Sequence, residues 1–263
     1  MNAATRILRY ELQNVRRTRA VLVYGLLLMA VTHALLHFGG GGSRAIVSLL
    51  NVVLVFVPMV SLVFGTVYLY SARDFIELLL AQPVSRQSLF AGIWGGLTLP
   101  LVLAFVLGTG LPFMWNGGLG DGTAAPLLLL LLSGSLLTAA FTAVAMWIAT
   151  RHDDRARGLG VALAVWVVVA IAWDGLILLV VASLGDWPLE LPLLALSLAN
   201  PVDAARVGLV LALDAPTLMG YTGAVTQRVL GLPGGAALTL AALGLWVIVP
   251  LSCARRRFRR KDF

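Results

Sequence analysis

The most regular feature of the sequence is a series of long apolar stretches separated by short polar segments. A helix needs about 20 mostly apolar residues to cross the hydrocarbon core of a bilayer. The apolar character here is continuous and does not alternate, which favours helices over the strands of a membrane barrel. We therefore predict an all-α polytopic membrane protein with six spans: Ala20–Phe38, Ile46–Tyr70, Gly92–Trp115, Pro126–Ala149, Leu159–Ser183 and Ala236–Ala254. Since no linker or internal repeat divides the chain, residues 1–263 are expected to form one transmembrane domain.

Composition supports this reading and excludes most soluble enzymes. The 263 residues are 60% hydrophobic and 12% charged, whereas a soluble chain is about 25% charged. The single lysine, Lys261, lies outside any glycine-rich loop, so the chain has no Walker A motif, and ATP with its Mg²⁺ would have to be bound by another chain. The single cysteine, Cys253, excludes an internal disulfide and a multi-cysteine metal site.

The distribution of basic residues predicts the orientation. With the N-terminus inside, sixteen of the 19 basic residues fall in cytoplasmic segments, and only Arg44, Arg206 and Arg228 fall outside. We therefore expect a multi-pass protein of the bacterial inner membrane with both termini in the cytoplasm. The basic tail after Ala254 is interpreted as an anchor at anionic membrane lipid rather than as a nucleic-acid site.

Three segments outside the spans are expected to be structured. Thr5–Arg19 has an apolar stripe amid arginines, which predicts an interfacial helix. Ser71–Ala91 lies between the second and third spans and predicts a short helix, with Phe75, Leu78 and Leu79 as its apolar set, that ends at Gln82–Pro83. Leu184–Gly235 is a long external stretch with a helical pattern of its own.

The Ser71–Ala91 segment admits two interpretations. It could be an amphipathic connector on the membrane surface, or a docking element for a cytoplasmic partner, because Asp74, Glu77 and Arg86 would face water. Ser85 is a plausible N-cap for a second short helix over Arg86–Ala91.

The run from Glu77 to Arg86, followed by Leu89 and Gly92, resembles the loop between spans two and three of type-2 ABC transporter permeases. The resemblance extends over the whole chain, since that family also has six spans, cytoplasmic termini, an N-terminal interfacial helix and short helices between spans five and six. It implies a separate ABC ATPase subunit as partner and a second permease copy. It also implies that this loop forms coupling helices contacting the ATPase, through the residues Glu77, Gln82, Pro83 and Arg86.

A second pair of runs, Asn200–Arg206 and Met219–Val225, is similar to the permease subunits of NosDFY-type transporters. Those transporters serve copper-site maturation of periplasmic nitrous oxide reductase. The resemblance implies a periplasmic β-helical subunit and work coupled to ATP hydrolysis in the partner. A generic type-2 exporter of a drug, lipid or ion is the alternative.

The residues of the external stretch can be interpreted independently of this resemblance. Asn200–Pro201 is a turn signal, Asp203 could cap a helix running to about Leu213, and a second helical stretch would start near Asp214. The stretch could be a ledge that closes the outer end of the bundle. It could also dock a periplasmic subunit through exposed side chains of Asp203, Arg206 and Arg228.

Met29, His33 and His37 share one face of the first span at spacings of four residues. Thioether and imidazole groups are plausible copper ligands. Histidines near the end of a helix also commonly sit at the membrane interface, so both interpretations stay open.

Asp174 is the one acid within a predicted span. A carboxylate in lipid is costly, on the order of 2.5–3.5 kcal/mol, and is therefore a functional candidate. It could line a translocation path, or it could be an interfacial or hydrogen-bonded acid.

Two further classes are disfavoured. An intramembrane protease would need a nucleophile and base such as Ser133 or Ser135 with His33, but no Gly-x-Ser-Gly motif lies in a span. A secondary transporter is expected to show repeats and broken helices, and the sequence indicates neither.

Overall fold

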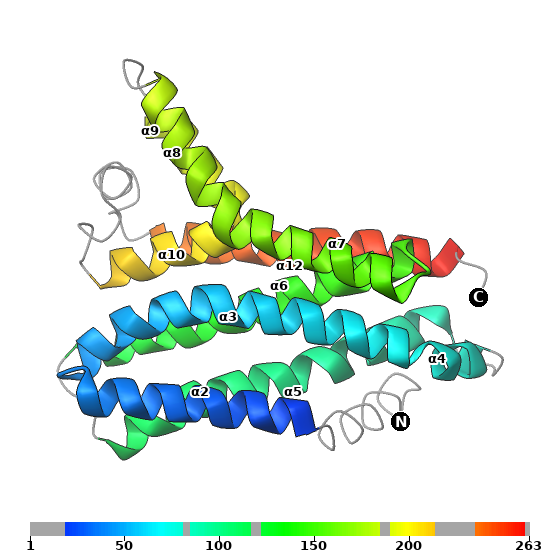
Figure 1. Ribbon diagram of the computed structural model, residues 1–263, viewed down its shortest axis with the longest axis horizontal. Helices are drawn as coiled ribbons and strands as arrows, with labels where there is room; N and C mark the ends of the chain where they lie inside the picture. Colours follow the sequence, from blue (N-terminus) through cyan, green and yellow to red (C-terminus); the bar gives the residue numbers. More distant parts are fainter. Residues whose placement is uncertain (1–18, 81–84, 117–121, 185–189, 214–234, 261–263) are drawn as a thin grey trace.

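The computed structural model describes residues 19–80, 85–116, 122–184, 190–213 and 235–260, and these are almost entirely helical (Figure 1). The elements, in chain order, are α2 (Arg19–Phe38), α3 (Gly42–Ser71), α4 (Arg73–Leu80), α5 (Arg86–Trp115), α6 (Ala124–Arg151), α7 (Arg155–Val167), the π-helix η1 (Val168–Ala172), α8 (Trp173–Leu184), α9 (Glu190–Ala199), α10 (Pro201–Ala212) and α12 (Gly235–Arg260).

Within these residues, six helical segments are long and apolar enough to cross a membrane, which agrees with the predicted six spans. The helices are longer than those spans at several ends: α3 begins at Gly42, and α12 continues through the basic tail to Arg260. The predicted separate helix over Arg86–Ala91 is wrong, because it is the first part of α5. Ser85 does cap it, with its Oγ 3.2 Å from the Ser88 amide, but the helix does not end at Ala91 and continues to Trp115.

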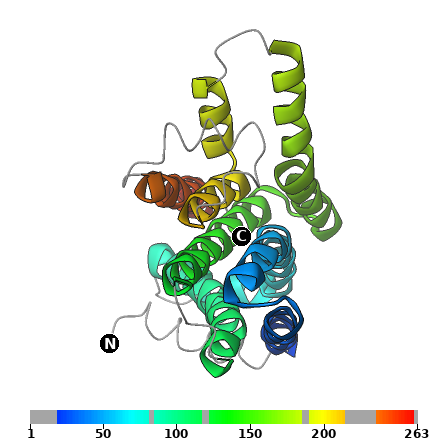
Figure 2. The same ribbon diagram turned by 90° about the vertical axis from the view of Figure 1, so that its left-hand side faces the viewer.

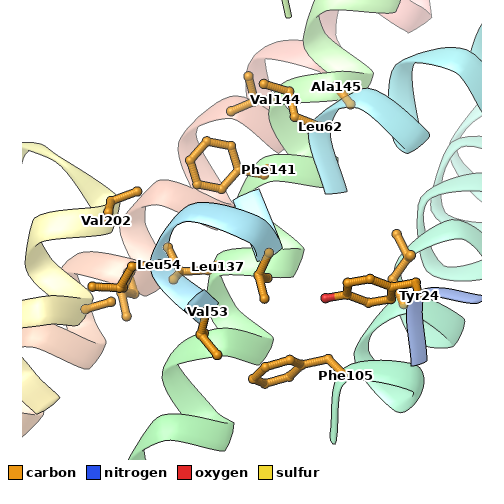
Figure 3. Packing of buried hydrophobic residues seen from close by; sticks show 14 of the residues in the cluster. Tyr24, Val53, Leu54, Leu62, Phe105, Leu137, Phe141, Val144, Ala145 and Val202 are labelled. Atoms are coloured by element: carbon orange, nitrogen blue, oxygen red, sulfur yellow. The ribbon is translucent and has the colours of Figure 1, made fainter. Parts of the chain in front are cut away.

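The long helices form three layers. In Figure 1, α2 and α5 lie at the bottom, α3 and α6 in the middle, and α7, α10 and α12 at the top, with α4 and the last turns of α12 at the same end of the bundle. Figure 3 shows side chains of the buried cluster, including Val53 and Leu54 of α3 and Leu137 and Phe141 of α6. Apolar packing fixes the central layer, and the hydroxyls of Thr98 and Thr142, 2.8 Å apart, satisfy each other there.

The fifth span departs from a plain helix. It runs from Arg155 to Ser183 but contains the π-turn η1. Beyond that turn, α8 leaves the bundle together with α9, and the two stand beside each other away from the other helices (Figure 2). Such π-turns are often found at functional sites.

The region after the fifth span contains a sharply bent helix pair. The Pro192–Ala199 and Pro201–Leu211 segments meet at 113° and are together apolar enough for a broken span or re-entrant loop. The expectation that the chain has no broken helix is therefore wrong. α10 packs against α6 and α12 with Ala204, Ala205 and Leu209 fully buried, so this part of the external stretch is folded against the bundle.

Several predictions fall on residues outside the described ranges. They are the interfacial helix before Arg19, the loop positions Gln82 and Pro83, the second external stretch from Asp214, and Arg228.

A close approach of α2 and α5 gives a stability prediction. A Cβ atom on Gly108 would lie 2.6 Å from the carbonyl oxygen of Gly25 and 3.0 Å from Cβ of Leu28. Because a backbone oxygen cannot move aside, Gly108→Ala should force the helices apart and destabilise the protein by about 1–3 kcal/mol. The measurement is thermal unfolding of the purified protein in detergent.

Gly110→Ala is the matched control on the same helix. Its Cβ would meet only Cδ1 of Leu131, at an ordinary 3.7 Å. Alanine favours a helix over glycine by up to about 1 kcal/mol, so this variant should be as stable as the wild type or more so. Equal melting of both variants would contradict the packing argument.

Candidate functional site

The short helix α4 is the first candidate site, since it joins two spans at the arginine-rich end of the bundle. Its buried residue is Ile76, whereas Leu78 is 68% exposed. The predicted apolar set of Phe75, Leu78 and Leu79 is therefore partly wrong: α4 packs through Ile76 and presents Leu78 outward. Leu78 is thus exposed at this end of the bundle, whereas the sequence pattern had placed it on the packed face.

Arg73 connects α4 to the turn between α6 and α7. Its Nε lies 3.3 Å from Oε1 of Glu77, and its Nη2 lies 3.1 Å from Oδ1 of Asp153. Its Nη1 also donates to the Asp153 carbonyl oxygen at 3.0 Å. Beside it, the Tyr70 hydroxyl donates to the His152 carbonyl at 2.8 Å. A displacement of α4 would therefore be passed to the α6–α7 turn.

The start of α5 is connected to the end of α12. Arg86 Nη1 donates to the carbonyl oxygen of Arg259 at 3.1 Å, and Arg255 Nη2 donates to Oε1 of Gln87 at 2.7 Å. The Phe90 and Phe258 rings pack with centroids 5.5 Å apart. Both sides of the loop between α3 and α5 are thus attached to other long helices.

Two of the four predicted coupling residues, Glu77 and Arg86, lie within the described ranges. Glu77 is 43% exposed at its side chain and pairs with Arg73, and Arg86 is exposed while it bonds to α12. Sequence reasoning missed Arg73 and Gln87, because neither belongs to a motif and their partners are about 80 and 168 residues away. Whether the loop contacts an ATPase stays a prediction.

The second candidate site lies where α9 turns into α10. Pro201 starts α10 without an amide N–H to donate, and Asn200 caps it by accepting from the Val202 amide at 2.9 Å. The predicted capping role of Asp203 is therefore wrong. The Asn200 side-chain amide donates to the Val169 carbonyl at 2.8 Å, which satisfies a backbone acceptor inside the π-turn. One side chain thus connects the bend to the fifth span.

An ion-pair cluster lies directly beside this bend. Arg206 Nη1 is 2.8 Å from Oδ1 of Asp174 on α8 and 2.8 Å from Oδ1 of Asp203 on α10. The Asp203 side chain is only 4% exposed and also contacts the Asn200 amide at 3.3 Å. Two carboxylates and one guanidinium carry a formal net charge of −1, and Arg206 holds the first turn of α8 against α10.

The cluster borders a cavity of about 420 Å³. Its polar lining comes from Asp174, Asp203 and Arg206 with Asn51 of α3 and Ser197 of α9, and the rest is apolar. The prediction that Asp203 is exposed for docking is wrong, because burial in α10 and its pairing with Arg206 turn it inward. Asp174 is hydrogen-bonded to Arg206 and borders this cavity, and its role in a translocation path stays a prediction.

The two histidines of α2 are exposed near the end of the helix opposite α4. Their rings are parallel with centroids 6.2 Å apart, and His33 Nδ1 lies 3.2 Å from Nδ2 of Asn116 at the end of α5. In the part of the chain that the structure describes, no group of three His, Cys, Asp or Glu residues could hold a metal ion. A ligand set that adds the thioether of Met29 to the two imidazoles stays a prediction.

The fold defines a multi-pass, all-helical membrane protein with an ion-pair cluster between α8 and α10 and a short helix, α4, at one end of the bundle. Residues 5–263 match the ABC-2 family of transporter proteins, and the chain belongs to that family. It is 27% identical over 280 residues to the "Probable ABC transporter permease protein NosY" of Stutzerimonas stutzeri, covering 99% of both chains. It is also 27% identical over 272 residues, 97% of both chains, to the protein of the same name from Pseudomonas aeruginosa.

Membership of this family settles the class of protein. The chain is a permease subunit and is not catalytic, and ATP is hydrolysed by a separate ABC ATPase subunit. The alternative of an intramembrane protease has no support in the geometry. Ser135 donates to the Leu131 carbonyl of its own helix, and the ring of His33 lies beside Asn116.

Proposed function

We propose that this permease couples ATP hydrolysis by its ATPase partner to transport or conformational work for the copper-site maturation of periplasmic nitrous oxide reductase. The observation that carries the proposal is the similarity to two NosY permeases over nearly the whole of each chain. The similar runs Asn200–Arg206 and Met219–Val225 support it, and Asn200 and Arg206 are the residues that build the bend and the ion-pair cluster.

In the proposed mechanism, closure of the ATPase pair pushes on α4 through Glu77 and the exposed Leu78, and on the start of α5 through Arg86. The Arg73–Asp153 ion pair passes this movement to the α6–α7 turn, and Arg86 passes it to α12. The fifth span begins at the same turn and leads through η1 to Asp174, so the outer cavity is the part of the path that a movement of this span would open or close.

The fifth span is also the surface that we assign to a second permease copy. Few of its side chains are buried within the chain, and Ile171, Leu178 and Leu179 are exposed. Both termini would lie in the cytoplasm, since the arginine-rich ends of α6 and α12 and the start of α7 share one end of the bundle with α4.

On the opposite side, the proposed partner is a periplasmic β-helical subunit. Arg206 is committed to the ion-pair cluster, so Arg228 is the remaining one of the three predicted docking residues. Copper could be handled by Met29, His33 and His37, which would provide one thioether and two imidazoles on one helix face.

The test is co-expression with the neighbouring genes, purification through a tag on the permease, and identification of bound subunits and metal. We expect an ABC ATPase and a β-helical periplasmic protein to co-purify. Arg228→Glu should weaken capture of the periplasmic protein without loss of the ATPase, whereas His33→Ala with His37→Ala should reduce only bound copper. Co-purification of the ATPase alone would favour a generic type-2 exporter of a drug, lipid or ion.

A further inference from the structure

A basic pocket of about 580 Å³ lies between the ends of α6 and α12, next to the Arg73–Asp153 ion pair. Four arginines line it: Arg151 from α6, and Arg256, Arg257 and Arg260 from α12. All four are exposed, and none of them has a carboxylate within ion-pair distance among the residues that the structure describes. Asp153 is the one acid of the lining, and its Oδ1 accepts from Arg73 at 3.1 Å. The pocket therefore carries several uncompensated positive charges.

The chemistry of the pocket is that of an anion site with bidentate donors. One guanidinium group can donate two parallel hydrogen bonds to the oxygens of a phosphodiester. Several guanidinium groups around one pocket neutralise the negative charge of the bound phosphodiester. The Arg151 guanidinium lies 5.7 Å from the ring centroid of Trp147, one turn earlier in α6. Tryptophan is enriched at the level of the lipid headgroups, so this pair places the pocket at the membrane interface.

An apolar stripe continues from the pocket along α12. Leu245 and Val249 are 59% and 52% exposed, and Ile248 is 64% exposed. Positions 245, 249, 252, 256 and 260 follow one another at helical spacing, so the stripe and two of the pocket arginines share one face of the helix. Along this face, exposed apolar side chains are followed by Ser252 and then by cationic ones.

We propose that this pocket binds the headgroup of an anionic phospholipid, whose acyl chains lie along the Leu245–Val249 stripe of α12. A phospholipid presents the same order along its length: apolar chains and then a phosphodiester. A free phosphate would not use the apolar stripe, and an acidic face of the ATPase would not reach a stripe that lies within a membrane span. The binding site is independent of the cargo and of the periplasmic partner.

The test compares two variants that each remove two positive charges, from faces of α12 that lie about 100° apart. Native mass spectrometry of the full-length permease, purified with its ATPase, is used to titrate phosphatidylglycerol, cardiolipin and phosphatidylethanolamine. Arg256→Gln with Arg260→Gln should weaken binding of the two anionic lipids by about tenfold to thirtyfold. Arg255→Gln with Arg259→Gln, on the face that contacts Gln87 and α5, should weaken it by no more than about threefold.

Four outcomes would overturn the proposal. They are equal weakening in both variants, unchanged anionic-lipid binding in the first variant, displacement of the bound lipid by millimolar inorganic phosphate, and loss of the ATPase from the first variant with lipid binding intact. If the first variant does not fold, Arg256→Lys with Arg260→Lys keeps the charge but not the paired donors, and should bind anionic lipid with intermediate affinity.

Discussion

Replacing Glu77 by Arg together with Arg86 by Glu is expected to abolish association with the ATPase while the permease still inserts in the membrane. Both positions are exposed: Glu77 lies on α4, and Arg86 lies at the start of α5. Reversal of both charges would put repulsive contacts into a docked interface, and truncating one buried interfacial charge alone costs about 2–5 kcal/mol. The amount of ATPase pulled down by tagged permease should therefore fall more than tenfold, because each loss of about 1.4 kcal/mol in binding free energy lowers the affinity tenfold.

The structure adds two controls to this experiment. Glu77 also pairs with Arg73, so its reversal could disturb α4 itself. Leu78→Asp changes an exposed side chain at the same helix and should give the same loss without touching that pair. Arg44→Glu reverses a charge in the first turn of α3, at the opposite end of the bundle. It should leave the amount of ATPase pulled down unchanged. Wild-type levels of ATPase with the reversed loop would show that docking occurs elsewhere.

The largest effect on stability is expected from Arg206→Met. The substitution leaves Asp203, with its side chain 4% exposed, without its cationic partner. Removing one partner of a buried pair costs about 3–5 kcal/mol because the other charge remains buried. For a chain of this size, the midpoint of thermal unfolding should fall by about 6–15 °C.

Two companion variants separate the contributions of the cluster. Asp174→Asn should lower stability by less than about 1 kcal/mol, because the Asp174 side chain is 48% exposed. Arg206→Met with Asp203→Asn removes both charges and should recover much of the lost stability. If the double variant melts as low as Arg206→Met alone, the cost does not come from an uncompensated carboxylate.

The same cluster shows why the sequence pattern alone places Asp203 and Arg206 wrongly in solvent. Asp203 and Arg206 are three residues apart on a polar-looking run, and a polar run in an external loop is ordinarily solvated. Tertiary packing instead buries Ala204 and Ala205 between them against the bundle, so the charged neighbours turn to each other and to Asp174. The pair therefore works inside the permease, and the proposed periplasmic subunit would dock through other residues.

The sequence by itself determined the class, the number of spans and the short loop that resembles a coupling element. These features depend on local chemistry: continuous apolar runs must span a bilayer as helices, and the Ser85 side chain caps the helix that follows it. Local signals also placed the turn at Asn200–Pro201, because proline cannot continue the preceding backbone hydrogen bonds.

Only the tertiary structure decided which of these residues meet. The partners of Arg73 and Arg206 lie 80 and 32 residues away, and a helix can present a side chain to any of several neighbours once it is inside a bundle. The π-turn in the fifth span lies beside the side-chain amide of Asn200, which donates a hydrogen bond to the Val169 carbonyl from 31 residues further along the chain. Hydrophobic periodicity reports how apolar each helix face is, but it carries no information on which other helix covers that face.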